Sequence, residues 1–202
     1  MSLGELPVSA LQGPPMTRRI PEATAAPVDA AERRKARFER LVHEHHDFVW
    51  RCARRLGVRT GDLDDVVQEV FLKAARNLDS ITHERGFLFR ACAFAAAHAR
   101  RSVQRRREVV DDELVGAELD GAANPEETVE TNQQREQLQR MLDALPTELR
   151  EVFVLFELEN FTKPEVAQAL NLPPGTAASR LRRAREEFMI IAARVVRTGG
   201  SR

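Results

Sequence analysis

Residues 171–186, NLPPGTAASRLRRARE, contain the sharpest break in the chain and the start of a new helix. The two prolines stop the preceding helix, because proline donates no amide hydrogen bond and restricts the residue before it. Asn171 stands where a helix end needs a left-handed residue, a position at which Asn commonly replaces Gly. Downstream, apolar residues recur at the spacing of one buried helical face, namely Ala177, Leu181, Ala184 and Phe188.

The segment before this break, FTKPEVAQAL (161–170), predicts a second short helix. Thr162 and Glu165 have the spacing of a capping box, in which each side chain bonds the backbone amide of the other. Pro164 is tolerated in a first turn, since the amides there have no intrahelical partner. Small Ala167 allows two helices to approach closely. Helix, tight turn and helix together predict a helix-turn-helix.

The exposed face of the last helix carries short polar side chains first and arginines behind them. Four arginines fall within six residues, at positions 180, 182, 183 and 185. Short residues let a helix end enter the major groove, where arginine can donate two hydrogen bonds to guanine. A solvated charged face is the alternative explanation. We predict DNA contacts from Thr176, Ser179, Arg180, Arg182 and Arg183.

Composition describes a soluble globular protein of 202 residues, with 43% hydrophobic and 31% charged residues and no net charge. Three of the 31 basic residues are lysine and the others are arginine, a bias that a GC-rich genome also produces. The chain has no apolar run of membrane-spanning length and no secretory signal pattern at its start. We therefore expect a cytoplasmic protein. Cys52 and Cys92 lie among apolar helical positions, which favours buried free thiols over a disulfide.

Periodicity predicts an all-α fold of two small domains, since helical spacing recurs and no long period-two alternation is present. Residues 1–32 are rich in proline and are predicted to be a disordered extension. Residues 33–107 contain three amphipathic helices that can share one core. Residues 108–130 are rich in carboxylates and are predicted to be a flexible linker. Residues 131–195 form the helix-turn-helix domain, and 196–202 a disordered tail.

The first domain ends in a second cluster of cations. Arg100, Arg101, Arg105, Arg106 and Arg107 fall within eight residues. The helix dipole favours cations at a helix C-terminus, but it does not require so many. Two basic surfaces joined by an acidic tether indicate that one nucleic acid is contacted at two places.

Two segments carry a family resemblance. GDLDDVVQEVFLKAARNL (61–78) strongly resembles region 2 of bacterial sigma factors, and LPTELREVFVLFELENFTKPEVAQALNLPPGTAASRLRRARE (145–186) resembles region 4. A chain with only these two regions is similar to the extracytoplasmic-function (ECF) class of the sigma-70 family. The resemblance covers about residues 35–190. It implies a non-enzymatic RNA polymerase sigma factor, without cofactor or metal, that directs promoter-specific transcription initiation.

The resemblance also implies partners and roles for individual residues. Core RNA polymerase would be bound through the clamp of its largest subunit and the flap of its second-largest subunit. The clamp would dock on the acidic helix face formed by Asp62, Asp64, Asp65, Gln68 and Glu69. Residues 80–107 would open and read the minus-ten element, with Phe87 and Phe89 as candidate base contacts beside the arginines. The last helix would read the minus-thirty-five element, and an anti-sigma factor is a further expected partner.

The chain departs from the family pattern at two places. Ala93-Phe94 stands where an Arg-Asn pair is frequent, and Ala177-Ala178 replaces a common Val-Lys, which removes one phosphate contact. Two other functions stay open, a stand-alone helix-turn-helix regulator and a decoy that binds polymerase but not DNA. A zinc protease helix would need a second histidine at position 47, where HEHHD (43–47) has Asp47, so His43 and His46 do not predict a metal site.

Overall fold

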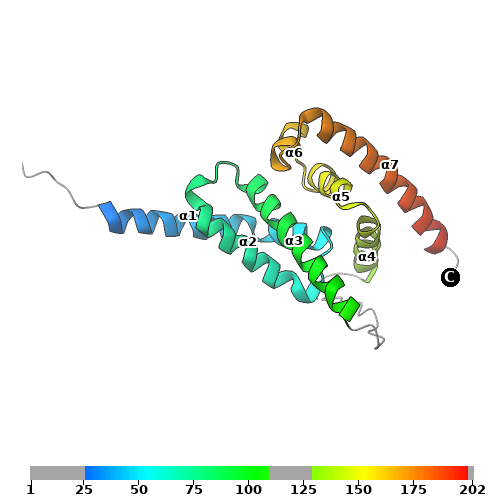
Figure 1. The fold of residues 1–202 in the computed structure, drawn as a ribbon, viewed down its shortest axis with the longest axis horizontal. Helices are drawn as coiled ribbons and strands as arrows, with labels where there is room; N and C mark the ends of the chain where they lie inside the picture. Colours follow the sequence, from blue (N-terminus) through cyan, green and yellow to red (C-terminus); the bar gives the residue numbers. More distant parts are fainter. Residues whose placement is uncertain (1–25, 110–128, 200–202) are drawn as a thin grey trace, which may run out of the picture.

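The structure, a computed structural model, describes residues 26–109 and 129–199, and the described residues form helices connected by turns (Figure 1). The helices gather into two groups that lie side by side, with α1, α2 and α3 in one group and α4 to α7 in the other. The predicted all-α fold is confirmed. The first part of the predicted N-terminal extension, the central part of the linker and the last residues of the tail lie outside the described residues.

The first group is a three-helix domain. It consists of α1 (Ala26–Arg55), η1 (Thr60–Asp62), α2 (Leu63–Asn77), η2 (Leu78–Ser80) and α3 (Glu84–Val109). The apolar residues that repeat at helical spacing meet in its core, where Val49, Leu63 and Leu88 are at most 1% exposed. Helix α1 begins at Ala26, earlier than the predicted start at residue 33. An ion pair one turn apart, between Asp29 and Arg33, accompanies this longer helix.

The second group contains α4 (Val129–Asp143), α5 (Thr147–Phe153), the π-helical turn η3 (Val154–Leu158), α6 (Lys163–Ala169) and α7 (Pro174–Gly199). Leu142, Val152 and Leu155 are fully buried at its centre. Helix α7 packs across both α5 and α6. The first turns of α7 lie beside α6 (Figure 1).

The two domains are joined at a buried carboxylate. Glu159, which follows η3, is 3% exposed and is surrounded by arginines of the first domain. Its carboxylate pairs with Arg55 and lies 3.4 Å from Arg51 Nη2, and Arg85 Nη2 donates to its backbone carbonyl at 2.7 Å. The Arg85 guanidinium also lies over the ring of Phe161, 4.5 Å from its centroid. Carboxylates are rarely buried in proteins unless they are paired with cations. The cations that pair with Glu159 come from the other domain, so this cluster holds the two domains together.

Arginines also reach across the interface to helix C-termini, where free carbonyls favour cations. Arg90 of α3 donates to the Gln168 and Ala169 carbonyls at the end of α6, at 3.2 and 3.3 Å. Arg150 of α5 donates to the Leu56 carbonyl at the end of α1, at 3.2 Å. The two domains therefore dock through polar contacts as well as apolar packing.

Both cysteines are free and buried in the first domain, as predicted. Cys52 and Cys92 are fully inaccessible, and burial raises the pKa of the Cys92 thiol to about 12. Burial also raises the pKa of the Cys52 thiol well above its usual value. Since the thiolate is the reactive form, neither side chain is poised for chemistry.

We expect the native protein to resist a thiol reagent such as dithionitrobenzoate at pH 8, and both thiols to react once the protein is unfolded in urea. Absorbance of the released thionitrobenzoate measures the result. Free N-acetylcysteine serves as the control for reagent activity. Labelling of the native protein at the rate of the control would contradict the buried position of these thiols.

Candidate nucleic-acid interface

The start of α6 and the turn between α6 and α7 have the geometry predicted from their sequence. Thr162 Oγ1 accepts a hydrogen bond from the Glu165 amide at 3.5 Å, and the Thr162 amide donates to the Glu165 carboxylate at 2.8 Å. Asn171 has a φ of 51°, the left-handed conformation that ends a helix. The Leu172 amide donates to the Ala167 carbonyl at 2.8 Å and closes the turn. The helix-turn-helix prediction is confirmed.

Helix α7 has one buried face and one exposed face over its first turns. Ala177, Leu181 and Ala184 are at most 4% exposed. Phe188 stacks on Phe153 of α5, with ring centroids 4.4 Å apart. The residues predicted to contact DNA lie away from this core: Ser179, Arg182 and Arg183 are exposed, and Thr176 and Arg180 are partly exposed. Short polar residues therefore come first along the accessible face, and cations follow.

The arginines of α7 differ in their partners within the protein. Arg182 pairs with Glu186 one turn along the helix at 2.7 Å, and Arg185 pairs with Glu157 at 2.6 Å. Arg180 lies near Glu151 of α5. Burial raises the pKa of Glu151, and the charges of Arg100 and Arg180 partly offset that rise. Within the described part of the chain, Arg183 makes no hydrogen bond or ion pair, so its guanidinium is available to a ligand.

The acidic residues of α2 line the exposed side of that helix, as their spacing predicts. Asp64, Asp65, Gln68 and Glu69 are exposed and Asp62 is partly exposed, whereas the opposite side of α2 is buried in the core. A shallow groove of about 170 Å³ runs between this face and α3, lined on the α3 side by His98 and Ser102. The acidic face is therefore a continuous accessible surface, and no core packing depends on its charged ends.

The predicted DNA-contacting residues of α3 do not all share one environment. Arg101 and Arg105 are exposed. Arg100 is partly buried and donates to the Leu56 carbonyl at 2.7 Å, so it holds α3 against the end of α1. The side chains of Arg106 and Arg107 lie outside the described residues.

The two aromatic candidates on α3 differ in the same way. Phe87 is partly buried against the core, and Phe89 is fully buried within it. The prediction that Phe89 contacts a base is therefore wrong, because the ring is enclosed in the core and cannot reach a base without leaving it. Phe94 is the exposed aromatic of α3 that reasoning from the sequence missed, at 58% exposure. The signal in the sequence is the Ala93-Phe94 pair, which departs from the family pattern at this position.

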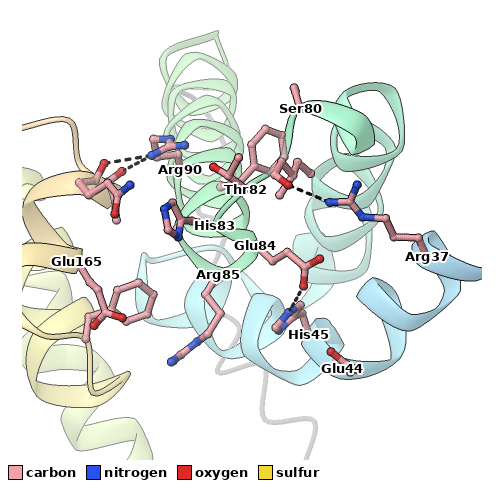
Figure 2. Close-up of a pocket in the computed structure, with 16 residues that line it drawn as sticks. Arg37, Glu44, His45, Ser80, Thr82, His83, Glu84, Arg85, Arg90 and Glu165 are labelled. Carbon is pink, nitrogen blue, oxygen red and sulfur yellow. Dashed lines mark hydrogen bonds and ion pairs between the residues drawn. The ribbon is translucent and has the colours of Figure 1, made fainter. Parts of the chain in front are cut away.

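A groove of about 520 Å³ lies between the two domains (Figure 2). Its walls come from α1, from the turn and first residues of α3, and from α6. Arg37 donates to the Ile81 carbonyl at 2.8 Å on one side, and Arg90 bonds the end of α6 on the other. His83 and Arg85 project between them (Figure 2). One wall of the groove therefore belongs to the segment predicted to read the minus-ten element, and the groove lies at the domain contact.

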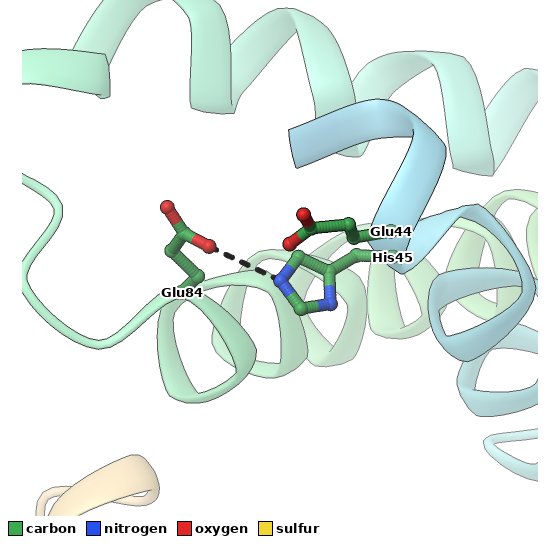
Figure 3. A group of neighbouring side chains, drawn as sticks. All are labelled: Glu44, His45 and Glu84. Atoms are coloured by element: carbon green, nitrogen blue, oxygen red, sulfur yellow. Dashed lines mark hydrogen bonds and ion pairs between the residues drawn. The ribbon is translucent and has the colours of Figure 1, made fainter. Parts of the chain in front are cut away.

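An imidazole and two carboxylates meet at the edge of this groove (Figure 3). His45 Nε2 lies 3.2 Å from a carboxylate oxygen of Glu84, and Glu44 is the third member. The ligand atoms of the three residues lie within 4.8 Å of one another, a spacing that exposed acidic groups often have without a metal ion. The His45–Glu84 contact ties α1 to the first turn of α3. It does not involve His43 and His46, the pair considered from the sequence.

Comparison with known families identifies both domains. The sigma-70 region 2 family matches residues 41–108, and the sigma-70 region 4 family matches residues 135–188. The ECF RNA polymerase sigma-E factor of Escherichia coli strain K12 is 34% identical over 139 residues, covering 64% of this chain and 73% of that protein. The ECF RNA polymerase sigma factor SigE of Mycolicibacterium smegmatis is 32% identical over 157 residues, covering 75% of this chain and 60% of that protein.

Two solved structures share the fold. One is CnrH in complex with the cytosolic domain of CnrY, with a TM-score of 0.61 and 24% identity, covering 81% of this chain and 92% of CnrH. The other is the sigma factor RpoE in complex with the anti-sigma factor NepR from Bartonella quintana, with a TM-score of 0.61 and 19% identity, covering 76% of this chain and 95% of RpoE. Within the described residues, no helix has both the length and the apolarity to cross a membrane. The order of the two regions, the helix-turn-helix and these relatives establish that the chain belongs to the ECF class of sigma-70 family RNA polymerase sigma factors, which are not enzymes.

Proposed function

We propose that this sigma factor binds core RNA polymerase and directs initiation by contacting the minus-ten element through its region 2 domain (33–107) and the minus-thirty-five element through its region 4 domain (131–195). One observation carries this proposal: the chain has two separate accessible surfaces of different character. The first part of α7 is exposed and belongs to a helix-turn-helix, and the exposed face of α2 in region 2 is acidic. One surface suits DNA and the other suits a protein, and initiation requires both.

Promoter recognition is assigned to the accessible face of α7. Arg183 is exposed and unpaired within the described residues, and Thr176 and Ser179 are short enough to let the helix approach base edges. A guanidinium can donate two parallel hydrogen bonds to guanine O6 and N7. Arg182 and Arg185 already pair with carboxylates, so we assign them to the phosphate backbone, where exchange of one anionic partner for another is feasible.

Polymerase docking is assigned to the acidic face of α2, which would contact the clamp of the largest subunit. Region 4 would contact the flap of the second-largest subunit. Because the two structural relatives are recorded in complex with CnrY and the anti-sigma factor NepR, we also propose that an anti-sigma factor binds this chain. These roles place the protein in the cytoplasm.

The proposed function is tested by reconstitution. Purified protein is mixed with purified bacterial core polymerase and with promoter DNA identified by sequencing transcripts after overexpression. Specific transcripts that depend on both the protein and the polymerase are expected. A stand-alone regulator would bind that duplex specifically without polymerase, and a decoy would bind polymerase without starting transcripts. Either result would overturn the proposal.

Reversing the charge at two positions of the acidic face is expected to weaken polymerase binding. An acidic face is expected to bind a basic surface of the polymerase. In the variant Asp65→Lys/Glu69→Lys, the two new lysines would repel that surface, and affinity for the polymerase should fall at least about tenfold. Fluorescence anisotropy of labelled protein with core polymerase measures the change. Thermal unfolding should be nearly unchanged, because both side chains are exposed.

A matched control separates local docking from total charge. Glu39→Lys/Asp47→Lys makes the same charge change on exposed positions of α1 in the same domain. It should bind polymerase almost as well as the unmodified protein. Equal losses in the two double variants would show that net charge, and not the face of α2, governs the interaction.

A further inference from the structure

We propose that Glu44, His45 and Glu84 form a binding site for a divalent transition-metal ion, for which Zn²⁺ is the best match. The three side chains converge where α1 meets the first turn of α3 (Figure 3). His45 offers the ring nitrogen Nε2, and the two glutamates offer carboxylate oxygens. The family resemblance implies no metal, so the site goes beyond the proposed function and is tested without polymerase or DNA.

The distances within this group suit one small ion. Zn²⁺ binds nitrogen and oxygen ligands at about 2.0–2.2 Å, so two ligands of a tetrahedral ion lie roughly 3.4 Å apart. His45 Nε2 and Glu84 Oε2 are 3.2 Å apart, which is close to that separation. All three ligand atoms lie within 4.8 Å of one another. Because Glu44 is exposed, its side chain can rotate to shorten the remaining distance.

The donor atoms select the class of ion. Two carboxylates carry two negative charges, which one divalent cation balances. Ca²⁺ and Mg²⁺ favour oxygen ligands alone, whereas Zn²⁺ accepts imidazole and carboxylate together. The imidazole also distinguishes this group from an ordinary cluster of exposed acids, since the side chains of His45 and Glu84 are only 15% and 35% exposed. Three protein ligands leave the fourth position of a tetrahedral ion to water.

Neighbouring cations are bound elsewhere. Arg37 and Arg85 line the same groove of about 520 Å³ as the three ligands (Figure 2). Arg37 donates to the Ile81 carbonyl at 2.8 Å, and Arg85 donates to the Glu159 carbonyl at 2.7 Å. Within the described residues, neither guanidinium pairs with a carboxylate of this group. The groove opens to solvent beside the ligands, which gives an ion a path of entry.

A bound ion has a structural consequence. It joins Glu44 to the existing His45–Glu84 contact, so α1 and the first turn of α3 are linked by three side chains instead of two. Glu84 directly precedes Arg85, whose guanidinium lies 4.5 Å from the ring centroid of Phe161 in the other domain. Metal binding is therefore expected to stabilise the region 2 domain and to hold this arginine at the domain contact.

The test is calorimetric titration of ZnCl₂ into the full chain, purified without a histidine tag, treated with EDTA and dialysed. One equivalent of Zn²⁺ should bind, and MgCl₂ should not bind. Glu44→Gln, which keeps the shape of an exposed side chain, should weaken Zn²⁺ binding at least about tenfold, and His45→Ala should abolish it. Saturating Zn²⁺ should raise the midpoint of thermal unfolding of the unmodified protein by at least about 4 °C, and that of Glu44→Gln by less.

His43→Ala and Glu39→Gln are matched controls, because each removes an exposed side chain of the same kind from α1. Both should bind Zn²⁺ like the unmodified protein. The proposal would be overturned by an unmodified protein that binds no Zn²⁺, or by equal affinity in Glu44→Gln. Loss of binding in His43→Ala alone would show adventitious binding by exposed histidines and would also overturn it. Thermal unfolding of Glu44→Gln in EDTA should be unchanged, so its result stands even where His45→Ala fails to fold.

Discussion

Replacement of Glu159 by alanine is expected to separate the two domains while leaving each of them folded. The Glu159 carboxylate is buried and pairs with Arg55, with Arg51 and Arg85 close by. Its removal leaves these cations facing one another without a counter-charge. Breaking a buried ion pair by removing one partner costs about 3–5 kcal/mol, and we expect the lower part of that range because the arginines keep access to water.

The loss should appear mainly in domain docking, because Glu159 pairs with arginines of the other helix group across the contact. Small-angle X-ray scattering should show an increased radius of gyration for Glu159→Ala, and urea unfolding should resolve into two transitions. Glu157→Ala is the matched control, since Glu157 is a carboxylate two positions away whose partner, Arg185, belongs to its own domain. Identical scattering of Glu159→Ala and the unmodified protein would contradict the role of this contact.

The proposed contacts with two promoter elements would also call for such a separation. Elements centred near positions minus ten and minus thirty-five lie about 25 base pairs apart, which is roughly 85 Å along straight B-DNA. Helix α7 has 26 residues and is therefore only about 39 Å long. Because the proposed function requires the two domains to reach both elements, we expect the contact at Glu159 to open when the protein binds its promoter. The polar character of the contact suits an interface that has to open.

Local signals explain why much of the second domain was predictable. The capping box at Thr162, the left-handed Asn171 and the apolar row of α7 each depend on residues within a few positions of one another. Helix-turn-helix geometry follows from such neighbours alone. The predicted start of α1, at residue 33, is too late. The prolines before that position indicate disorder, but Pro27 is compatible with the first turn of a helix.

Contacts between distant residues could not be predicted in the same way. Glu159 meets Arg55 across 104 positions of sequence, and nothing near Glu159 indicates that its carboxylate is buried. Phe89 and Phe94 show the same limit for single side chains. Both are aromatic residues on one helix, and only the packing of α1 and α2 against α3 decides that Phe89 is enclosed and Phe94 is exposed.

Replacement of Arg180 and Arg183 together by alanine should reduce transcription from cognate promoters about a hundredfold, because each bidentate contact to guanine contributes roughly 1–3 kcal/mol of discrimination. Binding to core polymerase should stay nearly the same, since the clamp-docking face is assigned to α2 and the flap contact of region 4 is not assigned to these two arginines. Abortive transcript yield and anisotropy with core polymerase measure the two functions separately. Arg197→Ala is the matched control, because it removes an exposed arginine near the far end of the same helix.

The two single variants should differ, and the difference tests the assigned geometry. Arg183 is exposed and unpaired within the described residues, so Arg183→Ala should affect promoter recognition without changing thermal stability. Arg180 is partly buried, and its charge lowers the pKa of Glu151, which burial raises. Arg180→Ala should therefore raise that pKa further and lower stability slightly near neutral pH, where the Glu151 carboxylate is ionised and has lost a stabilising cation. A fall in polymerase binding that parallels the fall in transcription would show that α7 does not separate the two functions.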